Sequence, residues 1–187
     1  EYGLLRGIGY SIFHSVSAFC NAGIDILGSD SLAKYICNPL INITTMLLII
    51  LSGIGFSVWY DVLGNIKKIR KKEIPGKWWF TRLRLHSKLA IVTTLILLAV
   101  GTLLTFLLEY HNPDTIGHLS FGEKWMASAF QSVTTRTAGY STFSQAGMHE
   151  ETRFLNILLM FIGGSPGGTA GGVKTTTIAM LMLTCIA

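Results

Sequence analysis

The sequence predicts an all-α membrane protein made of repeated units, each with a membrane span, a pore loop and a second span. Three observations support this fold class: an apolar composition, uncharged runs of membrane length, and two short apolar segments that each precede such a run. Hydrophobic residues make up 50% of the 187 residues and charged residues 13%, and the mean hydropathy is +0.49. A soluble domain carries roughly 25% charged residues, so this chain is not built to face water on every side.

Two runs without charge are long enough to cross a bilayer, Leu40–Tyr60 and Leu89–Leu108. About 20 apolar residues in a helix cover the ~30 Å hydrocarbon core. A third run, Phe154–Ala187, carries the single charge of Lys174 and a glycine-rich interruption. We therefore expect three spans. Residues Glu1–Tyr10 do not resemble a cleavable signal peptide, because they lack a basic segment followed by an apolar one.

Most of the positive charge lies between the first two spans. Only Glu73 accompanies the nine cations of this basic connector, residues 67–88. A short basic loop between spans is typical of the cytoplasmic side, and we expect it to contact anionic membrane lipid rather than nucleic acid. The connector cations are Lys67, Lys68, Arg70, Lys71, Lys72, Lys77, Arg82, Arg84 and Lys88.

With the connector inside, the chain between the second and third spans begins and ends on the outer face. Its apolar piece, Trp125–Val133, is too short to cross and is predicted to be a re-entrant pore helix. Backbone of this kind survives at membrane depth only where protein or a water-filled cavity surrounds it. The segment Ile8–Ala22 precedes the first span in the same way.

The two short segments belong to an internal repeat. In each unit a Phe-x-Ser-Val-[Ser/Thr] segment is followed by an Ala-Gly pair and then by a span with glycines near its middle. A single span separates the units, so the repeats have the same orientation, which disfavours an inverted-repeat transporter. With one inserted residue, the matching blocks are Phe13–Ser17 with Phe130–Thr134, Asn21–Ile24 with Thr137–Tyr140, and Leu47–Gly53 with Leu158–Gly164.

The repeated Ala-Gly segments are predicted to form a cation filter. The C-terminus of a pore helix that enters from outside points partial negative charge at the membrane centre. Glycine then permits backbone angles that turn carbonyl oxygens toward one axis, where a ring of them can replace the water shell of a potassium ion. The alternative is ordinary helix-packing glycines. The candidate filter residues are Asn21, Ala22, Gly23, Ile24, Thr137, Ala138, Gly139 and Tyr140.

A glycine-rich stretch interrupts the third span and is predicted to be a flexible gate on the inner side of the filter. Glycine costs ~1 kcal/mol and proline ~3 kcal/mol within a helix, so the stretch cannot stay helical. Small-residue helix packing is the alternative. A nucleotide phosphate loop is disfavoured because Val173 separates the last glycine from Lys174. The gate loop comprises Gly163, Gly164, Ser165, Pro166, Gly167, Gly168, Thr169, Ala170, Gly171 and Gly172.

Two cations near membrane depth are expected to support these elements, because charged side chains there usually face the protein interior or a cavity. Arg136, directly before the second filter segment, is expected to brace that segment by hydrogen bonds. Lys174 follows the gate loop, toward the cytoplasmic end of the span. Cys20, Cys37 and Cys185 show no ligand spacing, so the only metal we expect is potassium in the filter.

Three blocks of the sequence resemble the Trk/Ktr/HKT superfamily of potassium transporters, and within it the KtrB group of membrane subunits. The blocks are FHSVSAFCNAGID (Phe13–Asp25), SVTTRTAGYST (Ser132–Thr142) and GGSPGGTAGGVKTTT (Gly163–Thr177). The resemblance implies four span–pore–span repeats around one potassium filter, a potassium-channel-like architecture that is incomplete here. It then places the later part of repeat two in residues 1–66, the cytoplasmic connector in 67–88 and most of repeat three in 89–187.

The resemblance also implies the surroundings of the chain. It implies a multi-pass protein of the bacterial plasma membrane, a homodimer, and a cytosolic nucleotide-binding regulatory ring subunit near the connector. Potassium is the implied transported ion, with sodium coupling left open and no other cofactor. With half of the filter missing, these residues alone are not expected to conduct.

The sequence departs from the family at one position of each filter segment. The family commonly has Phe after the filter glycine, where this chain has Ile24 and Tyr140. A secondary transporter with broken helices and a non-conducting membrane assembly protein remain as alternative functions. No enzymatic activity is expected.

Overall fold

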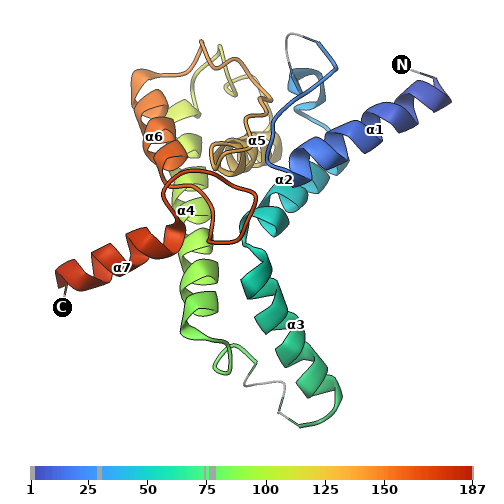
Figure 1. The fold of residues 1–187 in the computed structure, drawn as a ribbon. Coiled ribbons are helices and arrows are strands. Elements are labelled where there is room, and N and C mark those ends of the chain that lie inside the picture. Colours follow the sequence, from blue (N-terminus) through green and yellow to red (C-terminus); the bar gives the residue numbers. More distant parts are fainter. Residues whose placement is uncertain (1–2, 29–30, 74, 76–78, 187) are drawn as a thin grey trace.

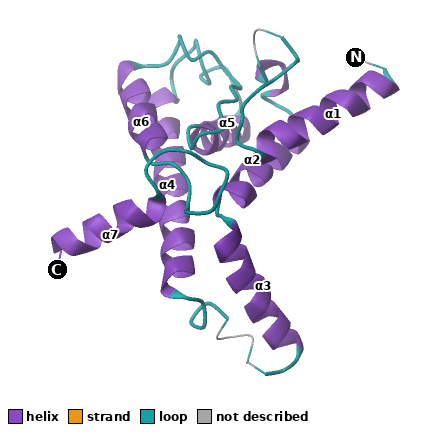
Figure 2. Cartoon of the chain, viewed as in Figure 1, coloured by secondary structure: helices purple, strands orange, loops and turns teal. Residues whose placement is uncertain are grey.

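The computed structural model describes residues 3–28, 31–73, 75 and 79–186. Over these residues the chain forms helices joined by loops, with a single isolated bridge between Ile162 and Val173 in place of any strand (Figure 1, Figure 2). The all-α prediction is confirmed. Residues 74 and 76–78 of the basic connector, with the predicted cation Lys77 among them, lie outside the described residues.

The N-terminal unit contains a pore helix and a broken span. Its elements are α1 (Leu4–Phe19), the 3-10 helix η1 (Ala33–Tyr35), α2 (Pro39–Gly53) and α3 (Phe56–Arg70). The side chain of Asn38 accepts hydrogen bonds from the N–H groups of Leu40 and Ile41, which starts α2 at Pro39.

The expected span over residues 40–60 is corrected by the structure, because α2 and α3 meet at a bend of 96°. The bend follows Gly53, and Gly55 has a φ of 92°. Only glycine adopts this left-handed angle without a steric cost. The uncharged run is therefore two helices joined at a sharp corner.

The C-terminal unit contains the long span, the second pore helix and two shorter helices joined by the glycine-rich loop. Its elements are α4 (Leu85–Glu109), α5 (Phe121–Thr134), α6 (Glu150–Phe161) and α7 (Thr175–Ile186). Among the described residues, α4 is the one helix that is long and apolar enough to cross a membrane by itself, and the bent pair α2–α3 passes the same test together. The span expected at 89–108 is thus confirmed. The α7 helix leaves α4 sideways instead of running beside it (Figure 1).

A buried carboxylate organises the outer loops on both flanks of α5. Glu109, the last residue of α4, accepts hydrogen bonds from the Asn112 side chain at 2.6 Å, the Thr115 hydroxyl at 2.7 Å and the His149 backbone N–H at 2.9 Å. A buried carboxylate without such donors would be costly. Because these bonds hold both flanks at one end of α4, α5 enters and the chain returns on the same side, as a re-entrant helix requires.

The core joins the two units. Ala18 of α1, Ile49 of α2, Phe130 and Val133 of α5, and Tyr140 after it belong to one buried cluster. The outward faces of α2, α4, α6 and α7 expose large apolar side chains, as a surface for lipid does. In Figure 1, α1, α3 and α7 extend from this centre in different directions.

Candidate functional site

The two candidate filter segments directly follow the C-terminal ends of α1 and α5, and they share one backbone pattern. The angle φ is 51° at Asn21 and 63° at Gly23, and it is 76° at Thr137 and 96° at Gly139, while the alanine between each pair keeps a negative φ. This alternation departs from the regular β-strand, in which every φ is negative and successive carbonyl oxygens point to opposite sides. A positive φ is uncommon for non-glycine residues, so its recurrence at Asn21 and Thr137 belongs to the repeat.

The two segments also lie side by side. A Cβ atom added to Gly23 would overlap the carbonyl oxygen of Ala138, and one added to Gly139 would lie 3.7 Å from the Cα atom of Gly23. The structure therefore brings together the two filter segments that the sequence predicts, although more than a hundred residues separate them.

Each pore helix holds its filter segment through one hydroxyl residue. In the N-terminal unit the Ser17 carbonyl accepts the N–H of Ala22 at 3.0 Å, and the Ser17 hydroxyl donates to the carbonyl of Ile24 at 2.7 Å. In the C-terminal unit Thr134 accepts the N–H of the filter alanine at 3.0 Å and donates to the carbonyl of Tyr140 at 2.7 Å. The same two bonds thus recur in both repeats.

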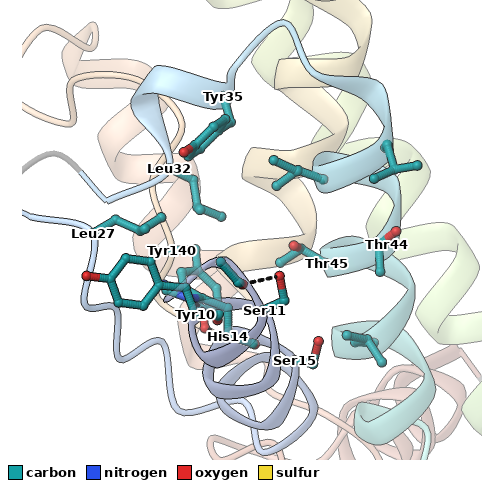
Figure 3. A pocket seen from close by; sticks show the side chains of 14 residues that line it. Tyr10, Ser11, His14, Ser15, Leu27, Leu32, Tyr35, Thr44, Thr45 and Tyr140 are labelled. Atoms are coloured by element: carbon teal, nitrogen blue, oxygen red, sulfur yellow. Dashed lines mark hydrogen bonds between the residues drawn. The ribbon is translucent and has the colours of Figure 1, made fainter. Parts of the chain in front are cut away.

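Tyr140 stands where the family commonly has Phe, and it packs behind the first filter segment. Its side chain is 2% exposed, whereas Ile24 at the matching position is 59% exposed. The Tyr140 hydroxyl donates to the carbonyl of Ile24 at 3.3 Å. Tyr140 also lines a cavity of about 390 Å³ between α1 and α2, where it lies beside His14 (Figure 3). This tyrosine therefore links the two repeats.

Backbone hydrogen bonds join the two ends of the gate loop, where it leaves α6 and enters α7, and we call this closure the neck. The N–H of Gly163 donates to the carbonyl of Val173, and the N–H of Val173 donates to the carbonyl of Phe161, both at 3.0 Å. The hydroxyls of Ser165 in the loop and Thr175 at the start of α7 lie 2.9 Å apart beside these bonds. The third run is broken here, as its glycines and proline predict.

The loop packs into the corner between α2 and α3. The N–H of Ser165 donates to the Gly53 carbonyl at 2.9 Å, and the N–H of Thr169 donates to the Ser52 carbonyl at 3.3 Å. The N–H of Phe56 in turn donates to the Gly167 carbonyl at 3.1 Å. Carbonyls at the end of a helix and N–H groups at the start of one lack partners within the helix, so the broken span of one repeat offers hydrogen bonds to the loop of the next.

The loop also contacts the first residue of each filter segment. The side-chain N–H of Asn21 donates to the Thr169 hydroxyl at 2.9 Å. The hydroxyl of Thr137 accepts the N–H of Gly171 at 3.2 Å. The gate loop therefore lies against the inner end of both candidate filter segments.

The two predicted supporting cations both bind the gate loop. Arg136 is buried and donates from Nη2 to the Gly163 carbonyl at 3.1 Å. Lys174 is half-buried and donates from Nζ to the Ala170 carbonyl at 2.8 Å. The Arg136 guanidinium thus donates to the gate loop and not to the filter segment that it was expected to brace.

Sequence reasoning missed the roles of Ser17, Thr134, Asn21 and Thr137 as side-chain partners. The signal was available for the first two, because both occupy the last position of the repeated Phe-x-Ser-Val-[Ser/Thr] motif. The partnership between the loop and the corner after Gly53 left no such signal, because it joins distant segments of unlike sequence.

The all-α fold, with two short helices that each lead into a candidate filter segment, is that of a pore-loop membrane protein. Residues 1–187 match the TrkH family, whose members are described as cation transport proteins. The chain belongs to this family. A crystal structure of the potassium transporter TrkH from Vibrio parahaemolyticus has the same fold, with a TM-score of 0.71 and 22% identity over 93% of this chain and 34% of that one.

Curated relatives match nearly the whole chain. The Ktr system potassium uptake protein B of Bacillus subtilis is 41% identical over 187 residues, which is 100% of this chain and 39% of that protein. The protein of the same name from Vibrio alginolyticus is 38% identical over 183 residues, 98% of this chain and 38% of the relative. The potassium/sodium uptake protein NtpJ of Enterococcus hirae is 41% identical over 185 residues, 98% of this chain and 38% of the relative. The chain thus spans about two fifths of the length of these relatives.

Proposed function

We propose that this chain forms part of the pore of a potassium uptake channel or transporter. Potassium passes along backbone carbonyls of the two filter segments, and the gate loop controls its passage. The observation that carries the proposal is the shared alternation of φ at Asn21 and Gly23 and at Thr137 and Gly139, at the ends of two pore helices. The names of the relatives, which include potassium uptake proteins, support potassium as the ion.

In this proposal residues 1–66 are the later part of the second of four repeats, residues 67–88 are the cytoplasmic connector, and residues 89–187 are most of the third repeat. The match to about two fifths of each relative is in keeping with two partial repeats out of four. The remaining repeats would complete the ring of carbonyls. A complete ring is what replaces the hydration shell of potassium.

The two helix ends favour a cation at the filter independently of Asp25, the acidic residue that directly follows Ile24. The C-terminal ends of α1 and α5 both point at their filter segments, and each helix end carries a partial negative charge of roughly half an elementary charge. Neutral carbonyls that bind weakly at several positions let an ion enter and also leave. This is the requirement for conduction as opposed to storage.

The gate loop is proposed to close the pathway in the arrangement described here. It contacts Asn21 and Thr137 at the inner end of the filter segments, and it is held from the other side by the corner after Gly53. Its contacts are hydrogen bonds to backbone and small polar groups, and each contributes only about 1 kcal/mol net. A loop held in this way can be displaced without unfolding the helices around it.

The assembly of the protein is part of the proposal. A homodimer in the bacterial plasma membrane, a cytosolic nucleotide-binding regulatory ring subunit, and contact of the connector with anionic lipid are the partners we propose. The word "system" in the names of the Ktr relatives supports a partner subunit. Cations at the end of α3, namely Lys67, Lys68 and Arg70, would meet either the ring or lipid headgroups.

The test uses a chimera in which this chain replaces the matching residues of the Bacillus subtilis relative, hereafter the Ktr chimera. Rubidium uptake reports potassium flux. We expect uptake by the Ktr chimera and a loss of discrimination against sodium when Gly23 or Gly139 is replaced by Ser. Unchanged selectivity in both variants would refute the filter assignment. Uptake of organic solutes in place of rubidium would favour a secondary transporter, and no flux from correctly inserted protein would favour an assembly role.

The gate is tested by deletion of residues 165–171 in the Ktr chimera, which joins Gly164 to Gly172 and leaves the neck residues in place. We expect rubidium flux to rise, because nothing then lies across the inner end of the filter segments. The matched control is Gly64→Ala, at a glycine with no atom near its Cβ position. Flux at the level of the control would overturn the gating role.

A further inference from the structure

We propose that Ser17 and Thr134 are positioning residues for ion selectivity, which they set by holding the outer carbonyls of the two filter segments in one orientation. This inference rests on the proposed potassium function. It assigns a task to the last residue of each Phe-x-Ser-Val-[Ser/Thr] motif. The two residues touch the filter backbone and act on the ion only through it.

The first support is that each residue contacts its filter segment at two points. The carbonyl of Ser17 holds the N–H of Ala22, and its hydroxyl holds the carbonyl of Ile24. Ser17 thus holds the residues before and after Gly23, whose backbone rotates most freely because glycine has no side chain. Thr134 makes the same pair of contacts at the same distances of 3.0 and 2.7 Å.

The second support is the direction in which these hydroxyls donate. The usual partner of a helical Ser or Thr hydroxyl is the carbonyl one turn back in its own helix. Ser11 and Thr135 follow this rule and donate to Gly7 and Gln131. Ser17 and Thr134, both buried, donate forward to the carbonyl beyond the filter glycine. Each forward bond therefore holds the carbonyl at the outer end of a filter segment.

The third support is a link between the repeats at the same place. The carbonyl of Ile24 accepts a second hydrogen bond from the hydroxyl of Tyr140 at 3.3 Å, and the carbonyl of Tyr140 is the one held by Thr134. The outer ends of both segments therefore belong to one network. A filter discriminates ions by the number and the flexibility of the carbonyls it presents, and a site supported by a second layer of hydrogen bonds keeps its geometry.

The experiment measures rubidium uptake and its inhibition by sodium in the Ktr chimera with Ser17→Ala, Thr134→Val or both. Each variant removes one hydroxyl and keeps the backbone carbonyl that accepts the alanine N–H. We expect the discrimination between rubidium and sodium to fall by roughly fivefold to tenfold per hydroxyl, the effect of one lost hydrogen bond. The conservative variants Ser17→Thr and Thr134→Ser retain a hydroxyl and should retain selectivity.

The matched controls are Ser11→Ala and Thr135→Val, which remove hydroxyls that bond within their own pore helices. They should change the amount of folded protein at most, and not its selectivity. Selectivity that stays normal in the double variant, while membrane insertion is normal, would overturn the inference and leave the filter itself in place. If the unmodified Ktr chimera takes up no rubidium, the proposed function fails and this inference fails with it.

Discussion

The two pore helices carry the same motif but differ in how they are packed. α5 buries most of one side against α4 and the core, and the hydroxyl of its Ser132 donates to the Leu98 carbonyl of α4 at 3.0 Å. In α1 only Ser17 and Ala18 are buried, and the matching Ser15 lines the open cavity of Figure 3. The difference teaches that one motif is compatible with two packings, because α5 lies along the long helix α4 whereas α1 packs against α2.

The backbone of the candidate filter segments is nearly the same in the two units despite this difference in packing. Both segments have the same sign of φ at matched positions and the same two hydrogen bonds to the pore helix. Local geometry is therefore the same in the two repeats, whereas the burial of the pore helix differs between them. Variants of the Ktr chimera test this difference, from the largest expected effect to the smallest.

The largest effect is expected at the filter glycines, and it should be unequal. Gly23→Ala adds a Cβ atom that overlaps the Ala138 carbonyl, and its φ of 63° is strained for alanine. Gly139→Ala is strained in φ but has room, with its nearest atom at 3.7 Å. We expect Gly23→Ala to abolish selective rubidium uptake and Gly139→Ala to leave a measurable part of it. Equal loss in both would show that packing between the segments has no influence.

The second prediction compares matched phenylalanines of the two motifs. Phe130 is 0% exposed and Phe13 is 37% exposed. Truncation of a buried phenylalanine costs about 3 kcal/mol or more because it leaves a cavity. We expect Phe130→Ala to lower the thermal unfolding temperature in detergent clearly more than Phe13→Ala. A larger loss in Phe13→Ala would mean that α1 is the more tightly packed helix in the complete protein.

The third prediction concerns the corner between α2 and α3 and the gate loop. In Gly55→Ala the new Cβ would lie 2.5 Å from the Pro166 carbonyl oxygen, at a φ of 92°. The loop must shift to relieve this overlap, and a loss of about 1–2 kcal/mol of docking free energy would raise rubidium flux by roughly fivefold to thirtyfold. Gly64→Ala in α3 is again the control, and its flux should equal that of the parent. Reduced flux in Gly55→Ala would contradict a closed loop.

The smallest effect is expected at the start of α5. The Glu123 carboxylate accepts hydrogen bonds from the hydroxyl of Ser120 at 2.7 Å and from its backbone N–H at 3.0 Å, and these bonds lower the pKa of Glu123. Its contribution to stability is therefore complete above the unfolded pKa of about 4.3 and is lost as the pH falls through the lower folded pKa.

Glu123→Gln should remove that part of the acid dependence of the unfolding temperature and change little at neutral pH. The matching helix α1 has no acidic residue in its first turn and no side-chain cap, so its start contributes no corresponding acid dependence. If the unfolding temperature of Glu123→Gln falls with acid as that of the parent does, the exposed carboxylate contributes nothing to stability.

Much of the fold and part of the site could be predicted from the residues alone. The uncharged run at 89–108 predicted α4, and the short apolar segments predicted α1 and α5. The repeated Ala-Gly pairs marked where special backbone angles occur, although the positive φ of Asn21 and Thr137 was not predicted. The run at 40–60 was expected to be one span, and the structure bends it by 96° between α2 and α3, because hydropathy records the apolar content of a run and not its direction. Gly53 and Gly55 were visible, but glycine permits a corner without requiring one.

What the sequence by itself determined is the set of local features: apolar length, the breaks at glycine and proline, and the repeated pore-helix and filter pattern. These follow from backbone sterics and hydrophobicity, which act over a few residues. Only the tertiary structure decided which partners these features meet. The gate loop binds the corner after Gly53 and the side chains of Asn21 and Thr137, because unpaired backbone groups at a helix break bond to whichever donors and acceptors the fold brings near.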